Sequence, residues 1–202
     1  MKRSTIYRVL IYIIGMLILA LGITLNTRTN LGVSPIISVA FCISKLTNTN
    51  IGDMTLLWYI VFVTIGILCH IKMKKYRMIL ADILQLPLSI VFTRFMNLFT
   101  VMIPDMTGNI AGRLCALAIA VVLTGMGIVL TLNVRLIPNP GDGIVQALAD
   151  LFCAKVSTVK NILDAGCVLF TAILGFAFAG KIIGIGAGTL LAVIFVGRVV
   201  DV

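Results

Sequence analysis

The stretch Thr24-Leu25-Asn26-Thr27-Arg28 closes a long apolar run and leads into Leu31-Gly32-Val33-Ser34-Pro35. The second half of the chain repeats this plan, because Thr131-Leu132-Asn133-Val134-Arg135 leads into Pro138-Asn139-Pro140-Gly141-Asp142-Gly143. In each copy a short apolar stretch follows the Gly/Pro-rich break. Glycine and proline interrupt regular helices, so each copy predicts a helix that ends, a break, and a short second helix.

The two copies lie at a nearly constant distance along the chain. Arg28 and Arg135 are 135 − 28 = 107 residues apart, and Pro35 and Pro140 are 140 − 35 = 105 residues apart. A repeated pattern at an almost fixed distance indicates an internal duplication.

The composition is typical of a membrane protein. Apolar residues make up 60% of the chain, charged residues 11%, and the mean hydropathy is +1.17. Soluble domains hold about 45–50% apolar and about 25% charged residues. Several apolar runs are long enough to cross the roughly 30 Å of bilayer hydrocarbon. Six spans are predicted, at about Ile6–Leu25, Met54–Ile71, Met78–Val101, Ala111–Leu132, Val159–Ala179 and Ile182–Val200.

Two further apolar pieces, 36–46 and 144–154, follow the breaks and are too short to span. We therefore expect an all-α polytopic protein with one membrane domain, 1–202. Repeat 1 (about 1–103) and repeat 2 (about 110–202) each hold three spans and one short broken or re-entrant helix. Because three is an odd number, the repeats face opposite ways in the membrane. The alternative has eight spans, with both short pieces crossing.

The basic residues predict the orientation of the chain. The formal net charge is +9, and the basic residues gather beside the spans, chiefly at Lys2, Arg3 and the segment Lys72–Arg77. The positive-inside rule places these clusters, and with them both termini, in the cytoplasm. We expect anionic lipid headgroups rather than nucleic acid as the partners of this charge.

Few residues are suited to catalysis or metal binding. The chain has one histidine, no glutamate, and five cysteines without Cys-x-x-Cys spacing. No serine–histidine or metal-ligand constellation is visible, so we expect no enzyme activity, no metal and no cofactor. Because the cysteines lack such spacing, we expect them to be small, buried, apolar side chains.

The two breaks supply the candidate site. A short helix after a break presents unpaired N–H groups and the positive end of its dipole, and Ser34 and Asp142 are candidate N-caps. One hypothesis is an anion or carboxylate site lined by Asn26, Arg28, Ser34, Asn133, Arg135 and Asp142. The alternative is that both arginines reach the headgroups and the breaks merely turn the chain. Asp142 favours a cation or a proton unless its carboxylate is used as a cap.

Other polar residues within the spans are placed by their spacing. Lys160 and Asp164 are four apart and can form an ion pair on one helix face. Gln85 and Ser89 are also four apart, and they either line a cavity or hydrogen-bond to a neighbouring helix. His70 stands beside the lysine-rich segment, where we expect it to be an interfacial residue.

Several short segments, in this order, carry a family resemblance. They are Leu31-Gly32-Val33-Ser34-Pro35 with Thr55-Leu56-Leu57-Trp58, Leu84-Gln85-Leu86-Pro87-Leu88-Ser89 with Phe92, Pro140-Gly141-Asp142-Gly143, Val159-Lys160 with Asp164, and Gly188-Thr189 with Gly197. Over nearly its whole length the chain resembles the YczE/YyaS/YitT family of bacterial integral membrane proteins. The resemblance implies a multi-pass protein of the bacterial cytoplasmic membrane and no particular reaction. Where members often carry charges, this chain has Gly186-Ala187 and Asn97.

Two functions remain open at this point. The duplicated breaks favour a small-solute transporter or permease-like protein, whose partners are the bilayer and a solute. The basic segment Lys72–Arg77 favours a non-transporting scaffold or regulatory protein that binds a membrane partner or forms a homo-oligomer.

Overall fold

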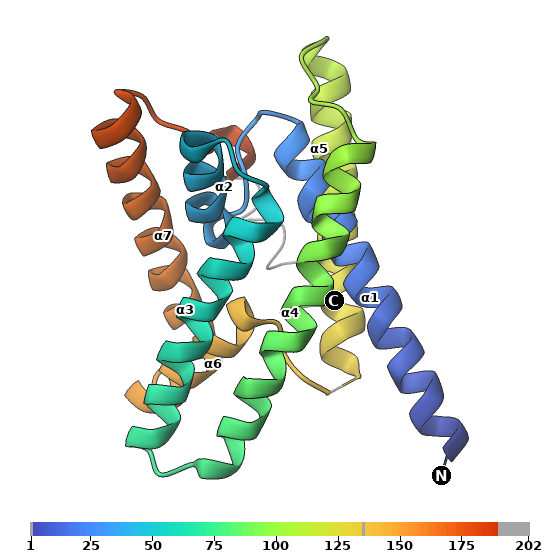
Figure 1. The fold of residues 1–202 in the computed structure, drawn as a ribbon, viewed down its shortest axis with the longest axis vertical. Helices are drawn as coiled ribbons and strands as arrows, with labels where there is room; N and C mark the ends of the chain where they lie inside the picture. The colour runs from blue at the N-terminus through green and yellow to red at the C-terminus, as the bar shows by residue number, and fades with distance from the viewer. Residues whose placement is uncertain (1, 135, 190–202) are drawn as a thin grey trace.

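The computed structural model describes residues 2–134 and 136–189 (Figure 1). Within these residues the chain folds into α-helices joined by short connections. They are α1 (Lys2–Arg28), α2 (Pro35–Thr47), α3 (Ile51–Lys72), α4 (Tyr76–Met102), α5 (Ile110–Asn133), α6 (Pro140–Phe152) and α7 (Val156–Ala179).

Five of these helices are long and apolar enough to cross a membrane: α3, α4, α5, α7, and α1 from Ile6 onward. The other two, α2 and α6, have 13 residues each. Helices of that length extend about 20 Å and fall short of the roughly 30 Å that a span requires. The described chain is thus a helical protein with membrane-spanning and short helices.

Large apolar side chains cover the outer faces of the long helices. Leu57 and Leu68 on α3 are 55% and 59% exposed, and Phe176 and Phe178 on α7 are 71% and 76% exposed. A soluble monomer rarely presents so much contiguous apolar surface to water, whereas lipid chains solvate it without cost. The exposed faces therefore indicate a membrane-embedded protein.

The observed helix bounds correct two predictions. α6 begins at Pro140, four residues before the predicted start, and Asp142 lies in its first turn instead of preceding it. The N-cap residues are Ser34 and Asn139, whose backbones are extended and whose side chains make no capping hydrogen bond. Proline is favoured at the first helical position because its missing N–H would be unpaired there anyway.

The predicted sixth span, Ile182–Val200, lies mainly outside the described residues. Its described part is not helical from Ile182 to Gly186, and a helix starts at Ala187.

The short helices lie in opposite halves of the molecule. In Figure 1, α1 and α5 cross along one side, α7 stands on the other, α2 occupies the upper half and α6 the lower half. Each short helix packs against a long helix from the other half of the sequence, α2 against α7 and α6 against α3. The N-termini of α2 and α6 consequently meet in the middle of the molecule.

Glycines allow α1 and α5 to approach closely. A Cβ atom on Gly22 would lie 2.6 Å from the backbone nitrogen of Thr124, and one on Gly127 would lie 2.6 Å from that of Leu19. Small residues at helix crossings permit this backbone contact in membranes. The two glycines are 127 − 22 = 105 residues apart, so the crossing uses equivalent positions of both halves.

At each end of the α1–α5 crossing, an arginine of one helix donates a hydrogen bond to the carbonyl that follows the other helix. Arg8 on α1 donates from Nη2 to the carbonyl of Val134 at 2.7 Å, and Arg113 on α5 donates from Nε to the carbonyl of Thr29 at 2.7 Å. Both carbonyls follow the end of a long helix, where helical hydrogen-bond partners run out. These arginines are also 113 − 8 = 105 residues apart.

The break between α1 and α2 receives its hydrogen bonds from the segment after α7. Val33 donates its N–H to the carbonyl of Gly184 at 2.9 Å, and Gly188 donates to the carbonyl of Leu31 at 2.7 Å. Backbone that leaves helical geometry at membrane depth needs such partners. Gly184 has a φ of +78°, a left-handed conformation that glycine adopts without strain.

Candidate functional site

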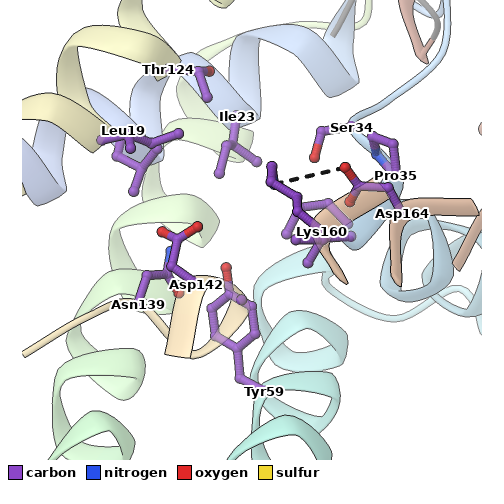
Figure 2. A pocket seen from close by; sticks show the side chains of 14 residues that line it. Leu19, Ile23, Ser34, Pro35, Tyr59, Thr124, Asn139, Asp142, Lys160 and Asp164 are labelled. Carbon is purple, nitrogen blue, oxygen red and sulfur yellow. Dashed lines mark ion pairs between the residues drawn. The ribbon is translucent and has the colours of Figure 1, made fainter. Parts of the chain in front are cut away.

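A cavity of about 70 Å³, with apolar and several polar side chains in its lining, lies where α2 and α6 begin. Figure 2 shows Ser34 at the start of α2, Asn139 and Asp142 at the start of α6, and side chains from four long helices around them. Water in a protein cavity needs about 10–15 Å³ by a comparable measure. The cavity is therefore large enough for a small solute or a few waters.

Polar groups from α3, α6 and α7 face this cavity. In Figure 2 the Asp142 carboxylate and the Tyr59 hydroxyl point into it from one side, with Lys160 and Asp164 opposite. Lys160 Nζ lies 3.7 Å from Asp164 Oδ2, so the ion pair predicted from their spacing is present. This separation is longer than a direct hydrogen bond. Both charged groups can therefore form a closer hydrogen bond with another partner.

Two acceptor atoms at the cavity are buried without a hydrogen-bond partner among the described residues. They are Oδ1 of Asp164 and Oδ1 of Asn139. Asp164 is 6% exposed, so bulk water does not solvate its carboxylate. An unsatisfied buried acceptor costs about 1–3 kcal/mol, and more when it is charged. Water in the cavity or a bound solute can supply the missing donors.

Most of the lining residues form pairs 105 residues apart, as in 139 − 34 = 105. The pairs are Leu19 with Thr124, Ile23 with Ile128, Ser34 with Asn139, Ile36 with Gly141, Ile37 with Asp142, and Tyr59 with Asp164. Corresponding positions of the two halves thus enclose a single cavity.

The two halves contribute different chemistry to it. The charged lining residues, Asp142, Lys160 and Asp164, all come from the second half. The positions 105 residues earlier hold an isoleucine, a threonine and a tyrosine. The charged side chains thus come from α6 and α7, and most of the remaining lining surface is apolar. Among the described residues, no group of three or more His, Cys, Asp or Glu side chains is arranged to hold a metal ion.

The structure brings together four of the residues expected from the sequence and places others elsewhere. Ser34, Asp142, Lys160 and Asp164 line the cavity. Arg28 does not, because its Nη1 lies 2.6 Å from Asp105 Oδ1 on the α4–α5 connection.

Of the other residues predicted to line the site, Asn26 and Asn133 also lie apart from the cavity. Asn26 is buried at 5% exposure and its carbonyl accepts a hydrogen bond from the Thr29 hydroxyl. Asn133 is exposed at the end of α5. Arg135 lies outside the described residues.

Gln85 and Ser89 line a second, smaller cavity of about 20 Å³ beside Asn139. The Ser89 hydroxyl donates to the Gln85 carbonyl on the same helix at 2.7 Å. The Gln85 side chain packs against α6, since a Cβ atom on Gly143 would lie 2.8 Å from its Nε2. These residues therefore form part of the support of α6.

His70 lies in the last turn of α3 beside the basic segment, and its side chain is buried within the protein. It is 3% exposed, and its Nδ1 lies 2.6 Å from Oδ2 of Asp82, which is 5% exposed. The two residues face each other across the turn between α3 and α4. Gln85 donates to the other oxygen of Asp82 at 3.3 Å, which connects this pair to the residues beneath α6.

Sequence reasoning missed Tyr59 and Asn139. The signal for Asn139 was available, because Asn139-Pro140 repeats Ser34-Pro35 as a cap followed by proline. Tyr59 could have been found as the residue 164 − 59 = 105 positions before Asp164. A comparison of equivalent positions in the two repeats identifies both.

These features define a class: a membrane-embedded helical protein with a small cavity, lined in part by charged side chains, at the start of two short helices. The chain matches the model of the Family of unknown function (DUF6198) over residues 6–202 and belongs to that family. It is 27% identical over 198 residues to the uncharacterized protein YyaS of Bacillus subtilis (strain 168), covering 95% of this chain and 89% of that protein. These matches confirm a YyaS-like membership. No solved structure matches the chain.

Proposed function

We propose that the protein is a small-solute transporter of the bacterial cytoplasmic membrane, with its binding site in the central cavity. The observation that carries this proposal is the cavity of about 70 Å³ at which both short helices begin, with three charged side chains in its lining, of which Asp164 is buried. Charged residues at membrane depth are expensive and mark solute or ion pathways by default. The proposed role involves binding and movement, with no catalytic step and no cofactor.

An inverted-repeat architecture with six spans is part of the proposal. It is supported by the exchanged packing of α2 on α7 and α6 on α3, and by the pairing of lining residues at a spacing of 105, as in 139 − 34 = 105. The sixth span would be the predicted helix ending near residue 200. Secondary transporters of this kind bind substrate at the repeat interface, beside the N-termini of broken helices.

Exposed ion pairs at opposite ends of the molecule fit a rocking motion. Arg28 pairs with Asp105 at one end, and Lys75 Nζ lies 2.7 Å from Asp150 Oδ2 at the other. The hydrogen bond from Lys75 holds the pKa of Asp150 below its ordinary value. Exposed pairs contribute about 0–1 kcal/mol each, so either end can open at low cost while the other stays closed.

The second candidate is a non-transporting membrane scaffold or regulatory partner protein. Its supporting observation is the exposed basic turn between α3 and α4, with Lys72, Lys74 and Arg77 on the surface. Anionic headgroups account for the same charge. Crosslinking in native membranes discriminates: a stoichiometric protein partner, together with absence of transport, would favour the scaffold.

The transport proposal is tested in proteoliposomes with a panel of cationic, zwitterionic and anionic small solutes. We expect uptake of at least one class, and at least tenfold slower uptake in Asp142→Asn and Asp164→Asn. The matched control is Asp53→Asn, the same substitution at the exposed Asp53–Arg94 ion pair away from the cavity lining, which should transport normally. Unchanged uptake in both cavity variants, or no uptake of any solute, would rule the proposal out.

A further inference from the structure

The chemistry of the cavity indicates a solute class. Building on the proposed transport function, we infer that the cavity binds a small organic ammonium compound. Its N–H groups face Asp142, Asp164 and Asn139, and its carbon skeleton lies against the apolar side chains of α1 and α5.

The unsatisfied atoms of the cavity require a donor. Oδ1 of Asp164 and Oδ1 of Asn139 are both acceptors, and neither has a hydrogen-bond partner within the described residues. An ammonium group carries up to three N–H donors and no acceptor. A carboxylate or phosphate would bring further acceptors and leave both atoms unsatisfied.

The charge balance favours a cation. Two carboxylates, Asp142 and Asp164, face one ammonium, that of Lys160. Lys160 lies 3.7 Å from one Asp164 oxygen, beyond direct hydrogen-bond distance, and its side chain is 36% exposed. Asp142 forms no ion pair with another described residue, so a bound cation would supply the partner that its ionised form needs.

The apolar part of the lining distinguishes an organic ammonium from a metal ion. Leu19 and Ile23 on α1 and Ile128 on α5 line the cavity together. A dehydrated metal ion requires oxygen ligands on all sides, and these apolar side chains offer none. An alkylammonium has one polar end and one apolar end, which matches this mixed lining. A cavity of about 70 Å³ restricts the skeleton to a few carbon atoms.

The test is ligand-dependent thermal unfolding of the purified protein in detergent, with ethylammonium chloride as the probe. At ten times its Kd, we expect Tm to rise by about 3–6 °C for a chain of this size. Sodium chloride and sodium acetate at the same ionic strength should produce no comparable rise. An equal rise with sodium would indicate a metal-ion site, an equal rise with acetate would indicate an anion site, and either result would overturn the inference.

Variants assign the effect to the cavity. Asp142→Asn and Asp164→Asn should abolish the ethylammonium shift, whereas Asp150→Asn at the surface end of α6 should retain it. A shift that survives both cavity substitutions contradicts the inference. Should a cavity variant fail to fold, carbodiimide activation of the wild-type protein in ethylammonium replaces it: the bound amine should attack the activated carboxyl of Asp142 or Asp164 and form an ethylamide while the urea leaves. Ethylamide at exposed carboxyls alone contradicts the inference.

The inference and the transport proposal fail in different ways. If the proteoliposomes take up an anionic solute and ethylammonium gives no shift, the protein is a transporter and the inferred solute class is wrong. If ethylammonium binds in the cavity but no solute moves, the ligand class stands and the transport proposal is wrong.

Discussion

At the scale of single residues, His70 and Asp82 join α3 to α4 through two buried side chains 2.6 Å apart. We predict that His70→Ala and Asp82→Ala each destabilise the protein by about 1–3 kcal/mol, because each leaves the other buried polar group without its main partner. The measurement is the free energy of unfolding in mixed detergent micelles.

The double variant tests whether the two residues act as a pair. Coupled buried partners show interaction energies of about 0.5–3 kcal/mol, and hydrogen bonds between membrane helices lie toward the low end. The loss in the double variant should therefore be about 1 kcal/mol smaller than the two single losses combined. Strict additivity would mean that each residue contributes through other contacts.

Contacts between two side chains could be predicted from the sequence where both residues lie on one helix and their spacing decides the contact. Lys160 and Asp164 are four apart on α7, and their contact follows from helix geometry. His70 and Asp82 are joined by the angle between two helices and by the turn between them, neither of which a single sequence specifies. The role of Asp142 was misjudged because its capping chemistry was considered without the proline two positions earlier, which fixes where α6 starts.

At the scale of elements, the crossing of α1 and α5 depends on backbone contact at glycine. A Cβ atom at Gly127 would lie 2.6 Å from the Leu19 nitrogen, whereas one at Gly112, on the same helix, would meet no atom within 4 Å. We predict that Gly127→Ala costs about 1–3 kcal/mol, the usual cost of overpacking. Gly112→Ala should cost nothing or stabilise by up to about 1 kcal/mol.

Unfolding of both variants in mixed micelles checks this prediction. The pair is matched in residue type and helix, so intrinsic helix propensity is the same in both. Equal stability of the two variants would show that α1 and α5 can separate without penalty. The close crossing would then not hold the halves together.

The long helices could be predicted from hydropathy, because a span requires a long apolar run and little else. The packing partners of the short helices could not. α2 lies on α7 and α6 lies on α3, contacts between segments far apart in sequence that depend on how the halves fit together. The hydrogen bonds between the break after α1 and the segment around Gly184 could not be predicted for the same reason.

At the scale of the whole molecule, the proposed architecture specifies which connections lie on each side of the membrane. The exposed Cys153 follows α6, whose Asp150 pairs with Lys75 in the basic α3–α4 turn, so both belong to the predicted cytoplasmic side. Gly108, in the α4–α5 connection, is exposed, and a Cβ atom added to it would meet no atom within 4 Å, so the substitution G108C is tolerated there. In Figure 1 this connection is at the opposite end from the α3–α4 turn.

Cysteine labelling with a membrane-impermeant maleimide tests this arrangement. In a Cys115→Ala background, which removes the other exposed cysteine, Cys153 should react in inverted vesicles and stay unlabelled in intact spheroplasts. G108C, combined with Cys153→Ala, should show the reverse, since α5 is long enough to cross the bilayer between the two sites. Cys42, Cys69 and Cys167 are buried and serve as the unreactive background. Labelling of both positions from one side would overturn the opposed orientation of the halves, and labelling with the sides exchanged would place the basic turn outside, against the positive-inside rule.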